Sequence, residues 1–430
     1  MSSINQWSRR DFVATVSRTA GLATAAPMVS GFAKGRGKRR RIALLATEVR
    51  KYSHAQHFID RFLEGYGWAG AHHYPDLELA GLYVDQMPDG DLSLERSARH
   101  RVKIYPTVEE ALTLGRSKLA VDGVVIIAEH GLYARTEIGQ TIYPRHEFFK
   151  RTTKVFESSG RSVPVFNDKH LSTDWNECVA MVEGAKRLGF PFMAGSSLPV
   201  TWRIPALEIP LNAELAESVS ICYGGFDSYD FHGLETAQCM SERRAGGESG
   251  VTAVQTLRGG KVWDLLKNRE STRRLFFAAL SRSFTCKGPE EYPGALPDLD
   301  WLREHHDDPA VYCFEHRDGL RTFMFLLKGL VTDFTYAGLL QKTGEILSCQ
   351  MYLPMPPALS TLANFFNPLV NHIERMIYEN APPYPIERTL LTSGMTIFAL
   401  KSLYEEQKRL LTPELKVAYA PKNQSTFWRK

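Results

Sequence analysis

Two segments of the chain carry residue types suited to acid–base catalysis. Lys169 directly follows the short run at residues 163–168. A lysine partly screened from water can have a lowered pKa and share a proton with a substrate oxygen. His232 lies between Asp230 and Glu235, and a carboxylate on the same helix can orient an imidazole for the same task. The alternatives are a solvated loop lysine and a histidine satisfied on a helix surface.

A third polar segment, Glu129-His130, follows the strongest buried-strand signal in the chain, at residues 121–127. Open α/β sheets bind ligands outside the carboxyl ends of their strands. Glu129 and His130 are therefore predicted to line a pocket.

Other histidines and the cysteines suggest little chemistry. A metal could be held near His54 and His57, near residues 72–73 or near residues 304–308. None of these groups forms a closed ligand set, and the cysteines lack zinc spacing. Solvated polar segments are the favoured interpretation, and no metal is predicted.

The elements that must position these residues differ between the two parts of the chain. The first part alternates strands with helices, which predicts a parallel, doubly wound sheet. The expected strands are residues 41–46, 77–84, 121–127 and 163–166, and the expected helix N-caps are Ser53, Thr107 and Asp174. The fold class is α/β, with a Rossmann-like nucleotide-binding domain predicted at residues 42–168.

From about residue 200 the strands follow one another with turns between them. The expected strands are residues 218–223, 251–256, 310–315, 320–327 and 346–352. They predict an α+β domain with an open, mainly antiparallel sheet, at residues 169–419. Residues 420–430 are predicted to be a tail.

This order of elements resembles the glucose-fructose oxidoreductase, inositol dehydrogenase and rhizopine-catabolism family, over residues 42 to about 419. Several short motifs carry the resemblance. The matching segments are residues 107–112, 121–128, 166–170, 192–195, 203–205 and 230–235. Residues 166–170 stand where the family has Glu-Lys-Pro, and residues 230–235 resemble its His-x-x-Asp segment, with Glu235 as the carboxylate.

The resemblance implies hydride transfer between a nicotinamide cofactor, NAD or NADP, and a sugar or polyol carbon. It makes Lys169 the expected partner of the substrate oxygen and His232 the expected acid or base. Glu235 or Asp230 would orient His232. The cleft would hold these residues together with His130. The open second sheet suggests self-association, as in relatives, so a homo-oligomer is a further expectation.

One departure from the family concerns the cofactor. The glycines that let a backbone approach a diphosphate are expected at positions occupied here by Ala46, Glu48 and Lys51. Asp85 could bind a ribose hydroxyl, but it lies farther along the chain than the ~20 residues typical of the fingerprint. The predicted cofactor contacts are Ala46, Glu48, Asp85, Glu129 and His130.

The amino-terminal end resembles an export signal. Residues 8–13, Ser-Arg-Arg-Asp-Phe-Val, match the twin-arginine pattern, and an apolar run follows at residues 19–32. Residues 1–33 are the predicted signal peptide and residues 34–41 a basic linker. The protein is expected in the periplasm or outside the cell, with no stable membrane span once the signal is removed.

Composition narrows the function classes. The chain has 430 residues, 43% of them hydrophobic and 23% charged, which indicates a folded protein. Its net charge of +4 comes from the arginines and lysines of residues 34–41, and the rest is net negative. A negative body argues against nucleic-acid binding. Three hypotheses follow: an exported oxidoreductase acting on a sugar or polyol, a redox-inactive carbohydrate-binding protein, and a cofactor-independent sugar lyase or hydrolase using Lys169 and His232.

Overall fold

The computed structural model describes residues 39–291 and 294–429, and residues 40–430 form one compact unit. The predicted signal peptide and most of the basic linker lie outside the described residues, so export stays a prediction. The last linker residues, Arg40 and Arg41, are the first residues of β1 (Arg40–Ala46).

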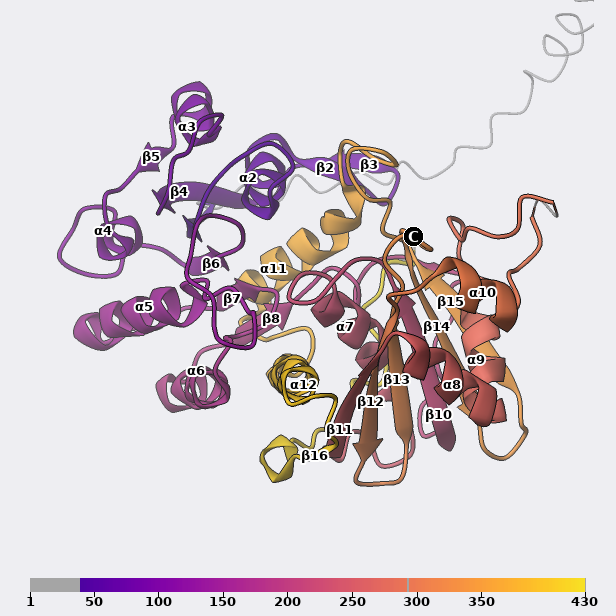
Figure 1. The fold of residues 1–430 in the computed structure, drawn as a ribbon. Coiled ribbons are helices and arrows are strands. Elements are labelled where there is room, and N and C mark those ends of the chain that lie inside the picture. The colour runs from indigo at the N-terminus through magenta and orange to yellow at the C-terminus, as the bar shows by residue number, and fades with distance from the viewer. Residues whose placement is uncertain (1–38, 292–293, 430) are drawn as a thin grey trace, which may run out of the picture. The chain divides into compact units, whose positions relative to one another are not determined.

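The first layer is a parallel six-stranded sheet in the order β5-β4-β1-β6-β7-β8 (Figure 1). Its other strands are β4 (Leu77–Val84), β5 (Lys103–Ile104), β6 (Gly123–Ile127), β7 (Val165–Asp168) and β8 (Phe192–Gly195). Residues 42–46 are completely buried, as expected for a central strand covered on both faces. This strand order places the crevice of a doubly wound sheet between β1 and β6.

Helices connect these strands. They are α2 (His54–Glu64), α3 (Ser93–His100), α4 (Val108–Thr113), α5 (Arg145–Ser159) and α6 (Trp175–Leu188). The three predicted N-caps are confirmed, because the side chains of Ser53, Thr107 and Asp174 each accept a backbone N–H of the helix that follows. After α2 the chain adds a hairpin of β2 (Tyr66–Trp68) and β3 (Ala71–His73).

The second sheet has eight strands in the order β16-β11-β12-β13-β10-β14-β15-β9. The strands are β9 (Arg203–Ile204), β10 (Leu215–Cys222), β11 (Val251–Arg258), β12 (Ala310–His316), β13 (Arg321–Leu326), β14 (Phe334–Leu340), β15 (Ile346–Met351) and β16 (Leu410–Leu411). Only the β10–β13 pair is parallel. The predicted fold class, a Rossmann-like sheet followed by an open and mainly antiparallel sheet, is confirmed.

Most of the remaining helices pack against the two faces of this second sheet, whereas the helix at Asn367–Glu379 packs against α2 and β2 (Figure 1). They are α7 (Asp230–Ser241), α8 (Gly260–Asn268), α9 (Glu270–Leu280), α10 (Leu299–His305), α11 (Asn367–Glu379) and α12 (Ile386–Tyr404), with short 3₁₀ turns at Asn364–Phe366 and Pro413–Leu415. Helices α8, α9 and α10 share a core with Phe323 and Phe325 of β13. Met324 and Leu326 point to the other face, into the core that includes the parallel sheet.

Helices α7 and α12 join the two sheets. Every residue of α7 is buried, and α12 contacts α6, α7, β8 and β11. The parallel sheet thus continues to β8, past residue 168, and the division into two domains at that residue stays a prediction. Within the described residues, none of the helices combines the length and apolar character needed to cross a bilayer.

Candidate active site

A cavity of about 350 Å³ lies at the carboxyl edge of the parallel sheet, where its strands end. We call it the central cavity. Its wall comes from the loop after β1, the ends of β6 and β7, the start of α7, and the segment between β15 and α11. Four of the predicted site residues line it together: Glu129, His130, Lys169 and His232.

Lys169 pairs with a buried carboxylate in this cavity. Its Nζ atom lies 2.8 Å from Glu129 Oε1, and Arg145 donates to the other oxygen of Glu129. Burial alone would raise the pKa of Glu129, but Lys169 and Arg145 outweigh burial and hold the pKa well below its ordinary range. The carboxylate of Glu129 therefore fixes the position of the Lys169 side chain in the cavity.

A histidine–carboxylate dyad faces the same cavity. His54 Nδ1 donates to Asp168 Oδ2 at 2.7 Å, and the Asp168 side chain is fully buried. Because a carboxylate only accepts, Nδ1 carries a proton, and in the neutral form of the ring Nε2 is the nitrogen that keeps its lone pair. A carboxylate that fixes the tautomer of a histidine is the arrangement of a general base.

His130 and His232 are neutral histidines. Burial lowers the pKa of His130 to about 3, and Arg50 donates to its Nδ1 atom at 3.1 Å. Burial, together with the positive charge of Lys169, holds the pKa of His232 well below its ordinary value. The rings of His54 and His232 have centroids 6.5 Å apart.

The two carboxylates expected to orient His232 lie elsewhere, which corrects the sequence-based expectation. Glu235 accepts from the backbone N–H of Ser196 at 2.7 Å, and burial raises the pKa of Glu235 to about 7. Asp230 accepts from Tyr312 at 3.0 Å, and burial raises its pKa to about 6. Among residues 39–291 and 294–429, the Nδ1 atom of His232 is buried without a hydrogen-bond partner. Because α7 is buried all round, its carboxylates face different neighbours.

The sequence analysis missed His54, Asp168 and Arg145 as site residues. His54 was considered only as a possible metal ligand, and its partner Asp168 is 114 positions away. No local pattern links two such positions. The one available signal was that Asp168 ends a strand and His54 begins the helix after another strand of the same sheet.

The predicted cofactor contacts at the first strand do not fit a dinucleotide. Ala46 is completely buried within β1. The carboxylate of Glu48 is 8% exposed and pairs with Arg50 at 2.6 Å. Both oxygens of Asp85 are occupied, by the hydroxyls of Tyr83 at 2.6 Å and Tyr133 at 2.7 Å. The groups that would hold the diphosphate and the ribose of NAD or NADP are thus either absent or already paired.

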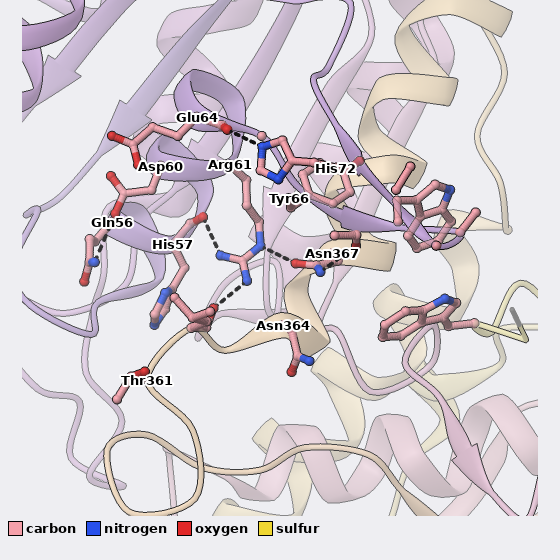
Figure 2. Close-up of a pocket in the computed structure, with 18 residues that line it drawn as sticks. Gln56, His57, Asp60, Arg61, Glu64, Tyr66, His72, Thr361, Asn364 and Asn367 are labelled. Atoms are coloured by element: carbon pink, nitrogen blue, oxygen red, sulfur yellow. Dashed lines mark hydrogen bonds between the residues drawn. The ribbon is translucent and has the colours of Figure 1, made fainter. Parts of the chain in front are cut away.

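A second, larger cavity of about 820 Å³ lies on the other side of α2, and we call it the outer cavity (Figure 2). It is bounded by α2, the β2–β3 hairpin, residues 361–367 and Trp428. The buried Arg61 donates to the carbonyl oxygens of His57 and Ala363 and to the side chain of Asn367. The outer cavity shares His57 with the central cavity, but it contains none of the predicted site residues.

Metal binding has no support in the part of the chain that is described. No group of three or more histidine, cysteine, aspartate or glutamate side chains there is placed to hold a metal ion.

Comparison with known proteins identifies the fold. No protein-family model matches the sequence, and no curated protein matches it. A search of solved structures does find matches. The myo-inositol dehydrogenase of Lactobacillus casei, in complex with NAD(H) and myo-inositol, matches with a TM-score of 0.54 at 12% identity, over 90% of this chain and 99% of that one. The chain has the inositol dehydrogenase fold.

Two further matches agree with this result. GenD2 from gentamicin A biosynthesis, in complex with NAD, has a TM-score of 0.54 at 11% identity, over 87% of this chain and 97% of that one. An oxidoreductase from Agrobacterium radiobacter, in complex with NAD+, L-tartaric acid and magnesium, has a TM-score of 0.50 at 11% identity, over 87% and 98%. The fold that the sequence resemblance implied is therefore confirmed.

Proposed function

We propose that this protein is an enzyme that moves protons on a sugar or polyol bound in the central cavity. The strongest support is that two side chains, each hydrogen-bonded to a buried carboxylate, line the same cavity. These pairs are His54 with Asp168, and Lys169 with Glu129. One supplies an oriented base and the other a fixed ammonium donor.

In this proposal His54 Nε2 takes a proton from the substrate, and Asp168 stabilises the imidazolium that forms. The ammonium of Lys169 donates a hydrogen bond to the substrate oxygen on which negative charge develops. His130 and His232 are neutral and can donate to or accept from further hydroxyl groups.

The substrate class is supported by the cavity and by the fold. About 350 Å³ is at the small end of ligand pockets, which suits one sugar or polyol ring. The wall combines histidines, tyrosines and Asp227 with the rings of Phe365 and Phe366. A protein of the same fold is described in complex with myo-inositol, a polyol.

A second candidate is nicotinamide-dependent hydride transfer on the same substrates. The fold and the strand order β5-β4-β1-β6-β7-β8 favour it, and three proteins of this fold are described in complex with NAD, NAD+ or NAD(H). A bound nicotinamide would supply the hydride acceptor. Only the proton transfer assigned to His54 and Lys169 would then come from the chain.

The test is a turnover assay on a panel of polyols and keto-sugars, followed by NMR, with and without NAD+ and NADP+. Wild-type protein is expected to convert a member of the panel, and His54→Gln to lose that conversion. Conversion that is unaffected in His54→Gln would contradict the assignment. Saturable binding of a sugar with no conversion would instead support a redox-inactive carbohydrate-binding protein.

We also propose that the protein is exported by the twin-arginine route. The Arg9-Arg10 pair and the apolar run after it support this proposal. The expected result is that wild-type chain is found in the periplasm or medium, and that Arg9→Lys with Arg10→Lys keeps the chain in the cytoplasm. Equal export of the double variant would reject the proposal.

A further inference from the structure

We infer that the chain fills with its own side chains the place where the adenosine diphosphate of a dinucleotide would lie, so that its chemistry runs without a dinucleotide. The statement about chemistry rests on the proposed function. The statement about the filled site rests on the contacts of the loop between β1 and α2, residues 47–53.

Several backbone N–H groups of this loop already donate to acceptors within the chain. In dinucleotide-binding proteins such N–H groups face the diphosphate at the start of the first helix. Here Val49 donates to Asp91 Oδ2 at 3.3 Å and Arg50 donates to Ser53 Oγ at 3.1 Å. Tyr52 donates to the side chain of Gln56 at 2.6 Å. A diphosphate would have to replace these acceptors.

The carboxylate of Asp91 accepts the Val49 N–H that a bound diphosphate would otherwise accept. Its other oxygen accepts the backbone N–H of Ser93 at 2.8 Å, which fixes the carboxylate between the loop and α3. The segment that carries it is laid against the loop by two backbone bonds, from Gln86 to Thr47 and from Leu92 to Val49, each 2.7 Å long. A diphosphate at this position would also meet the carboxylates of Asp91 and Glu48, which would repel it.

The carboxylate expected to bind a ribose, Asp85, is exposed, but both of its oxygens already accept hydroxyl groups. Tyr133, whose hydroxyl donates to Asp85, belongs to the loop after β6. The backbone of Leu132 in the same loop makes two hydrogen bonds with the side chain of Gln86. Gly131 has φ +103°, and a Cβ atom there would lie 2.7 Å from the ring of Tyr133. This close packing fixes the loop over the end of β4.

The central cavity does not reach this region. From the loop it is lined by Arg50 and Tyr52, whereas Asp85 and Asp91 are not part of its wall. A substrate ring can therefore occupy the cavity without displacing the contacts made by Asp85 and Asp91.

Without an oxidant, the reaction that balances is proton abstraction from a carbon next to a carbonyl group. The C–H bond breaks, its proton moves to His54 Nε2, and its electron pair forms an enediolate whose oxygen is held by Lys169. If the proton returns to the neighbouring carbon and the hydroxyl proton on that side passes to the first oxygen, the product is an isomer. If instead a β-hydroxyl or β-alkoxy group leaves with the bonding electron pair and takes the proton from His54, the products are an unsaturated carbonyl compound and water or an alcohol. The substrate class is a sugar that carries a carbonyl group.

The deciding experiment is hydrogen exchange measured by mass spectrometry on residues 47–56, with NAD+, NADH, NADP+ or NADPH added to the purified full chain. We expect no change in exchange with any of the four. Saturable protection of these residues by a dinucleotide would overturn the inference.

A variant tests the hydrogen bond itself. Asp91→Ala should speed exchange in residues 47–56, because Val49 loses its acceptor, whereas the exposed neighbour Asp89→Ala should not. If Asp91→Ala leaves exchange unchanged, Asp91 does not occupy the site as inferred.

The turnover found in the panel assay separates this inference from the proposed function. Activity should be unchanged after bound nucleotides are removed with charcoal. A loss that added NAD+ or NADP+ restores would overturn the inference while leaving the roles of His54 and Lys169 standing. Activity independent of both residues would reject the proposed function, and hydrogen exchange would still decide whether the site is filled.

Discussion

Asp168 is the residue whose role is most specific in this site. Replacement of Asp168 by Asn keeps the shape but lets the amide stabilise the wrong tautomer of His54. We predict a fall in kcat of roughly 10²- to 10⁴-fold, as for loss of a general base. The measurement is the pH profile of kcat, with exposed Asp89→Asn as the control. An unchanged profile in Asp168→Asn would mean that His54 is not the base.

Glu235 predicts a pH dependence of stability. Burial raises its pKa from 4.5 to about 7, so the folded chain keeps a proton that the unfolded chain releases between these values. Its contribution is fully present below pH about 4.5 and is lost as pH rises through about 7, a change of roughly 3 kcal/mol. We would measure the free energy of unfolding in urea at several pH values across this range. It should depend less steeply on pH for Glu235→Gln than for the wild type. Parallel curves would contradict the assignment.

At the residue scale, part of the candidate site could be predicted from the sequence. Glu129, His130 and Lys169 were predictable because each follows a strand of one parallel sheet, and such strands end at a common edge. The partnership of His54 with Asp168 was not, since it depends on how β1 and β7 are arranged. The prediction that Glu235 or Asp230 orients His232 was wrong. Residue spacing on a helix does not determine which neighbouring groups the side chains contact when the helix is buried on every side.

At the scale of elements, Arg61 links α2 to the segment that walls the central cavity. Its guanidinium donates to three carbonyl groups and to Asn367. Phe366, in the same segment, stacks on His57 and contacts the edge of His54. We predict that Arg61→Met destabilises the fold by about 1–3 kcal/mol, because buried acceptors lose their donor.

The same change should raise KM more than it lowers kcat, since the cavity wall moves while the dyad remains. Urea unfolding and steady-state kinetics would measure both effects. The matched control is Arg99→Met, whose side chain is 60% exposed and pairs with Glu64 at the surface. Equal behaviour of the two variants would show that Arg61 does not support the wall.

The elements themselves were largely predictable. The strand at residues 77–84 agrees with β4 at both ends, and the three N-caps form as expected. In contrast, β14 was not identified, although it lies inside the second sheet. Its run of buried residues, from Phe334 to Gly338, lacks the alternation that marks a strand with one polar face. The parallel pairing of β10 with β13 also could not be read from local pattern.

At the scale of the whole molecule, a doubly wound sheet has been kept while its usual ligand contacts have been replaced. The strand order and the crevice are those of a nucleotide-binding fold. At the crevice, however, Asp91 accepts the backbone N–H of Val49 and Tyr133 donates to Asp85, whereas the central cavity lies around Lys169. Similarity of fold therefore does not determine the reaction, which depends on these side chains.

The most direct test of this account is a comparison of turnover by wild-type protein and Lys169→Met on the polyol and keto-sugar panel, without added nucleotide. The control is Lys186→Met, an exposed lysine that pairs with Glu387. The account predicts that wild type and Lys186→Met convert the same substrate at the same rate and that Lys169→Met loses this activity. Full activity of Lys169→Met, or an absolute need for NAD+ or NADP+, would contradict it.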